Sequence, residues 1–108
     1  MKQHYPENLD EIIHGRSRLA VMAFLARVRT TDFVKLRDEL NLSDGSLSQA
    51  LKKLEEANIV KLDRVIDVNR TRTQVTLTRK GDDMFRQYVS KLNEMIGDVA
   101  AREERMAR

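Results

Sequence analysis

The chain has 108 residues, of which 41% are hydrophobic and 34% charged, a balance typical of one globular domain with a modest core. It has no cysteine, which excludes disulfide bonds, thiolate metal sites and thiol catalysis. The longest apolar run, residues 19–26, is too short to span a bilayer, and the polar N-terminus has no export signal. We therefore expect a cytoplasmic, soluble protein with no membrane partner.

The formal net charge of +3 arises in the middle of the chain. Residues 41–80 hold eight Lys and Arg against five Asp and Glu, and this difference equals the whole excess. A mild basic excess is compatible with nucleic acid as a partner, but it does not establish one.

The first helix is predicted over residues 9–28, with Gly15 as an interruption. Apolar residues with helical spacing are expected to form its buried face: Leu19, Met22, Ala23 and Ala26, widened by Val21 and Leu25.

The β-branched stretch 29–31 is long enough for an isolated bridge strand. Thr31 or Asp32 can then cap a second helix, in which Phe33, Leu36 and Leu40 share one face.

A third helix is predicted over residues 43–57, after a tight turn. Ser43 is a good N-cap residue, and Asn58 suits the left-handed position that ends a helix. The inner stripe of this helix consists of Leu47, Leu51 and Leu54, with Ala50 beside them. Its outer face begins with small residues, which are poor material for an ordinary solvated helix.

The pattern then changes to β. Two β-rich segments, 59–68 and 73–78, flank a polar turn with the sequence NRTR, so a hairpin is predicted, with its wing at residues 64–73.

Thr78 can cap a last helix, predicted over residues 79–106. This helix would be roughly 40 Å long, which is more than a core of three short helices can cover. It either folds over its own core as a monomer or pairs with a second copy across a two-fold axis, and we favour the second copy. The expected dimerisation residues are Phe85, Tyr88, Leu92, Met95, Ile96 and Val99.

The order helix, helix, turn, helix, hairpin and long helix predicts a winged helix-turn-helix. The fold class is mainly α with a small β-hairpin wing and a long C-terminal dimerisation helix. We expect one domain over residues 1–108, with the helix-turn-helix and wing in 9–80 and the dimerisation helix in 79–106.

Residues 9–95 resemble the small one-domain winged-helix transcriptional regulators of the MarR/ArsR-like superfamily. The most specific segments are Leu42–Leu47, which opens the third helix, and LTRKG at residues 77–81. The resemblance implies a homodimer that binds double-stranded operator DNA and represses, or sometimes activates, transcription. It also leaves open a small-molecule effector, of unknown identity, where the last helices meet the core.

Three positions depart from that family pattern. Ala50 stands where a His is frequent, Asn58 replaces the usual Gly, and Asn69 replaces the wing Asp of larger members.

The third helix has the properties of a recognition helix in the major groove. Small residues in its first turns, Ser43, Gly45, Ser46 and Ser48, let the backbone come close to DNA. Gln49 can pair with adenine through its amide. Lys52 and Lys53 are placed for phosphates, or form a solvated face with Glu55 and Glu56.

Arg70 and Arg72 belong to the hairpin tip, where an arginine can enter a narrow minor groove. The alternative is a charged, soluble tip. Arg64 is open to either interpretation, and phosphate contacts by Arg16 and Arg18 are equally open.

The sequence has no paired carboxylates with a pocket, no glycine-rich phosphate loop and no nucleophile constellation, so we expect no enzyme, no cofactor and no metal. Of the two histidines, His14 is expected to pack or hydrogen-bond near a helix junction. The leading hypothesis is a DNA-binding regulator, most often a repressor in such a family. The alternative is a protein–protein adaptor without specific DNA binding.

Overall fold

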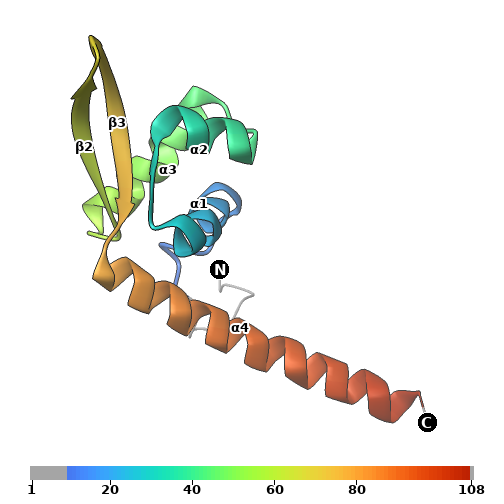
Figure 1. The fold of residues 1–108 in the computed structure, drawn as a ribbon. Coiled ribbons are helices and arrows are strands. Elements are labelled where there is room, and N and C mark those ends of the chain that lie inside the picture. Colours follow the sequence, from blue (N-terminus) through green and yellow to red (C-terminus); the bar gives the residue numbers. More distant parts are fainter. Residues whose placement is uncertain (1–9, 108) are drawn as a thin grey trace, which may run out of the picture.

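The computed structural model describes residues 10–107 as a helical body with a β-hairpin wing and a long last helix (Figure 1). The elements in chain order are α1 (Arg16–Val28), β1 (Thr30–Asp32), α2 (Phe33–Leu40), α3 (Asp44–Glu56), β2 (Val60–Asp67), β3 (Arg70–Leu77) and α4 (Arg79–Met106). The three strands form one antiparallel sheet in the order β1-β3-β2. The predicted fold class is confirmed.

Side-chain caps set the helix starts that the sequence predicts. Asp32, rather than Thr31, caps α2 by accepting a hydrogen bond from the backbone N–H of Lys35 at 2.8 Å. Ser43 caps α3, and Thr78 caps α4. Asn58 has a φ of 62°, so the chain leaves α3 through the left-handed conformation that the sequence indicated.

The first helix differs from the prediction in its start and in its buried face. Residues 10–14 form a separate turn, closed by the hydrogen bond from the His14 N–H to the Asp10 carbonyl at 2.8 Å. The side chains that α1 buries are Val21, Met22, Phe24 and Leu25, whereas Ala23 is exposed. α1 packs against the other three helices and against β1 and β3, so its neighbours, and not helical spacing alone, determine which side chains are buried.

The turn of the wing is shorter than predicted, and the second strand begins earlier. The strands stay paired up to Asp67 and Arg70, and only Val68 and Asn69 form the turn, with φ values of 40° and 65°. A two-residue turn with positive φ values matches the twist of the flanking strands, so pairing continues to the tip. The predicted turn residues Arg70, Thr71 and Arg72 therefore belong to β3.

The N-terminal half of α4 covers the core, and its C-terminal half extends beyond the body (Figure 1). Tyr88 is buried, and its hydroxyl is hydrogen-bonded to Nδ1 of His14 at 2.7 Å. The predicted role of His14 as a hydrogen-bonding residue at a junction is confirmed. Within residues 10–107, no helix is long and apolar enough to cross a membrane.

Candidate nucleic-acid interface

The outer face of α3 is a row of small and polar residues. Gly45, Gln49 and Lys52 follow at i, i+4 and i+7, so they share one face of the helix, and all three are exposed. Leu47, Leu51 and Leu54 lie on the opposite face and are buried in the core. The nine residues predicted to bind DNA are all exposed: Ser43, Gly45, Ser46, Ser48, Gln49, Lys52, Lys53, Arg70 and Arg72.

The first turn of α3 is fixed by its own serines. The Ser43 hydroxyl oxygen accepts a hydrogen bond from the backbone N–H of Ser46 at 3.0 Å, and the same hydroxyl donates to the Ser46 hydroxyl at 3.0 Å. A Cβ added at Gly45 would meet no atom within 4 Å. The packing of the chain therefore does not require a glycine there, and Gly45 keeps the surface of α3 low.

The N-terminus of α1 supplies a basic flank to this face. Arg16, Ser17 and Arg18 line a shallow concavity of about 260 Å³ together with Ser46, Gln49 and Lys53. The Nε of Arg18 donates to the carbonyl of Ile12 at 2.7 Å, so this arginine is committed to the N-terminal turn. Arg16 is exposed and forms no ion pair with any residue of the described range 10–107. The sequence did not distinguish Arg16 from Arg18 as a candidate for phosphate contacts. In the structure Arg16 is exposed, whereas Arg18 is engaged in a hydrogen bond.

An arginine of α2 braces the start of α3. The Arg37 guanidinium contacts one carboxylate oxygen of Asp44 and one of Asp38, each at 2.9 Å. The hydrogen bonds to Asp44 and Asp38 raise the pKa of Arg37 above its ordinary value. Sequence reasoning missed this brace, although Arg37 and Asp44 flank the turn. Its consequence is that Arg37 offsets the negative charge of Asp44, which directly precedes Gly45 of the outer row.

Arg70 and Arg72 of the wing have different surroundings. Arg72 lies 3.9 Å from an oxygen of Asp32 and 3.8 Å from an oxygen of Asp67. Asp32 is also the N-cap of α2, so one carboxylate joins the wing to the helix-turn-helix. Arg70 is exposed and, within residues 10–107, has no ion-pair partner. Arg70 and Arg64 are therefore exposed wing cations without an ion pair in the described range, whereas Arg72 lies between two carboxylates.

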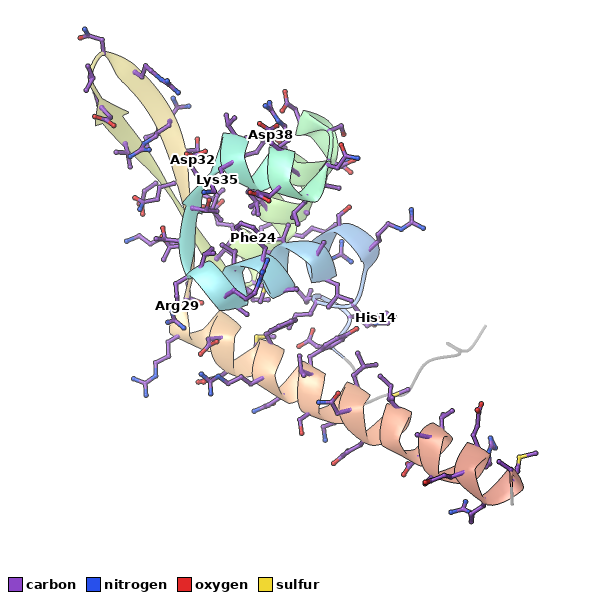
Figure 2. All side chains as sticks on the ribbon, turned by 45° about the vertical axis from the view of Figure 1, so that its right-hand side comes forward. His14, Phe24, Arg29, Asp32, Lys35 and Asp38 are labelled. Atoms are coloured by element: carbon purple, nitrogen blue, oxygen red, sulfur yellow. The ribbon has the colours of Figure 1, made fainter. Side chains whose placement is uncertain are left out.

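A concavity of about 920 Å³ separates α2 from the wing tip. Asp32, Lys35 and Asp38 reach it from α2 and its N-cap (Figure 2). Its walls carry four carboxylates and three cationic side chains, so its charge does not favour a phosphate strand. The contacts expected with DNA are therefore the outer face of α3 and the wing tip, rather than this gap.

The comparisons with known proteins agree with this geometry. Residues 17–96 match the family model of a winged helix DNA-binding domain. The chain belongs to that family. The uncharacterised protein MJ0432 of Methanocaldococcus jannaschii is 31% identical to this winged helix protein over 89 residues, which are 82% of this chain and 97% of that protein.

Solved structures share the fold of this winged helix protein. A transcriptional regulator homologue from Pyrococcus horikoshii OT3 is 30% identical, with a TM-score of 0.80 over 83% of this chain and 89% of that chain. Overoxidised AbfR bound to DNA is 25% identical, with a TM-score of 0.60 over 85% of this chain and 70% of that chain. The predicted resemblance to winged-helix transcriptional regulators is confirmed.

Proposed function

We propose that this winged helix protein is a homodimeric, sequence-specific DNA-binding repressor. The observation that carries the proposal is the exposed row of α3. It combines the absence of a side chain at Gly45 with the amide of Gln49 and the positive charge of Lys52. The wing tip lies on the side of the body away from α4, so the proposed contacts of the wing are separate from the long helix (Figure 1).

On this proposal, α3 enters the major groove with its N-terminal half. Gly45 allows the helix backbone to approach the base edges, and Gln49 pairs with an adenine through two hydrogen bonds. Lys52 and Lys53, together with Arg16 of the basic flank, contact phosphates on the groove walls.

The wing contacts the adjacent minor groove. Arg70 is exposed at the first residue of β3, next to the tip, and an arginine there is attracted by the negative potential of a narrow groove. Arg72 acts mainly by orienting the wing, because Asp32 and Asp67 flank its guanidinium. The structural relative AbfR has been solved in a DNA-bound form, which supports a DNA partner for this chain as well.

The second copy is proposed to pair through the C-terminal half of α4. Of the six residues expected at the interface, Tyr88 is buried in its own chain, and Phe85, Leu92 and Met95 pack partly against its own core. Ile96 and Val99 are 57% and 55% exposed, and Met106 is 79% exposed. The proposed interface therefore starts near Ile96. An effector at the junction of α4 with the core stays a prediction.

The direct test is a selection of duplexes of about 30 base pairs, three helical turns, from a random library by the purified protein. We expect the selected duplex to bind about a thousandfold more tightly than a scrambled duplex of the same composition. Gln49→Ala should relax the selected sequence at one position, whereas Glu39→Gln on α2 is the control and should leave it unchanged.

The adaptor hypothesis gives a different result. A protein that uses the serine-rich face for another protein should neither enrich any duplex nor be retained on heparin or DNA cellulose at low salt. Either finding would remove the basis of the proposed function.

A further inference from the structure

The tip of the wing exposes two large apolar side chains. Ile66 is 80% exposed and Val68 is 86% exposed, and no part of the described chain covers them. Ile66 continues the alternation of Val60 and Leu62, which face the core at the base of β2, but it lies beyond the helices. Single exposed apolar residues are ordinary on protein surfaces, so exposure alone does not indicate a function.

The backbone of the turn distinguishes this tip from an incidental patch. Val68 has a φ of 40°, in the left-handed region, and is followed by Asn69 at 65°. A β-branched residue in this conformation costs roughly 1–2 kcal/mol, and Asn or Gly is the usual choice for such a turn. The hairpin thus keeps an apolar side chain at its end where a small or polar residue would be more stable. Strain of this kind is concentrated at functional sites.

The strands of the wing carry a net positive charge, which favours a nucleic-acid duplex, whereas the α2 side of the gap beside the tip is rich in carboxylates. Residues 60–77 carry four basic and two acidic side chains, and the exposed Arg70 follows the turn directly. A hairpin with an apolar end and cations behind it fits the minor groove, where phosphates line the walls and sugars and base edges lie inside.

We propose that Ile66 and Val68 form an apolar wedge that enters the minor groove, partly unstacks one base step and bends the DNA. This inference rests on the proposed function, because it assigns the tip of the same binding surface. Apolar wedges of this type act most easily at flexible pyrimidine–purine steps, so the wing would read DNA deformability rather than a base edge.

The experiment measures the bend and the affinity on the selected duplex, labelled at both ends for energy transfer. We expect the wild-type protein to bend the duplex by at least about 20°. Ile66→Thr and Val68→Gly should each weaken binding roughly tenfold and reduce the bend, with the salt dependence of binding unchanged because no phosphate contact is lost. Asn69→Gly, which changes the adjacent turn residue without removing an apolar side chain, should bind and bend as the wild type does.

A loss of folding would not explain weaker binding by Val68→Gly. Glycine adopts the left-handed conformation of residue 68 without strain, so this variant should unfold at the same temperature as the wild type or higher. A bend that is absent in the wild type, or unchanged in both apolar variants, would overturn the wedge. If Arg70→Ala still weakens binding in that case, the proposed function stands without the wedge. If neither Arg70→Ala nor Gln49→Ala changes the affinity, the proposed function itself fails.

Discussion

A substitution at a single residue can change the stability of the free protein and its affinity for DNA in opposite directions, and Gly45 is the clearest case. An alanine Cβ at this position meets nothing within 4 Å, so Gly45→Ala should stabilise the free protein by about 0.5–1 kcal/mol. On DNA the same methyl group would stand between α3 and the groove and should weaken binding by about tenfold. Chemical denaturation and fluorescence anisotropy on the selected duplex measure the two effects. A variant that gains stability and loses no affinity would show that α3 does not approach DNA at Gly45.

Gly81 is the opposite case. A Cβ there would collide with the Ile59 carbonyl oxygen and would lie 2.8 Å from Cγ2 of Ile59, in a buried contact. We expect Gly81→Ala to lower the free energy of unfolding by about 2 kcal/mol, because backbone cannot move aside as a flexible side chain can. Urea denaturation checks this, with Gly45→Ala as the matched glycine-to-alanine control. A loss below that of an ordinary surface change would contradict the contact.

At the scale of elements, Asp32 joins two functions. One carboxylate oxygen caps α2 through the Lys35 N–H, and the other lies 3.9 Å from Arg72 of the wing. Asp32→Ala should cost about 1 kcal/mol of stability, whereas Asp32→Asn should cost much less because Asn caps equally well. Both variants should weaken DNA binding through a less well-held wing. Denaturation curves of the two variants that coincide would show that the cap contributes nothing.

Element positions follow from local chemistry that a sequence displays. The leucine stripe of α3 and the caps Asp32, Ser43 and Thr78 could be predicted, because capping and helical spacing act within a few residues.

Contacts between distant elements could not be predicted in the same way. The buried face of α1 depends on which neighbours surround it, so Ala23 was wrongly placed inside and Phe24 was missed. The partners of Arg72 lie on β1 and β2, and no sequence spacing brings them together. The turn was predicted over the polar residues 69–72, with Val68 in the preceding strand, because valine is a poor turn residue.

The whole molecule is elongated, with principal extents of 64 × 30 × 25 Å, because α4 continues past the body. The exposed apolar residues of α4, Ile96, Val99 and Met106, predict that two copies of the chain pair through this helix. Val99→Lys should weaken the dimer at least roughly tenfold, because a buried unpaired charge is costly, whereas Ala101→Lys on the opposite face should not. Sedimentation equilibrium measures this, and we expect a wild-type mass of twice the 12.5 kDa of one chain. Leu92→Lys is a poorer choice, because Leu92 also packs against its own core.

The central claim is that α3 and the wing form one DNA-binding surface. The most direct measurement is the affinity of the triple variant Gln49→Ala, Arg70→Ala and Arg72→Ala for the selected duplex, since all three side chains are exposed and the fold should persist. We expect a loss of at least about a hundredfold and a shallower dependence of binding on salt. A triple variant that is folded and binds the selected duplex as tightly as the wild type would contradict the claim.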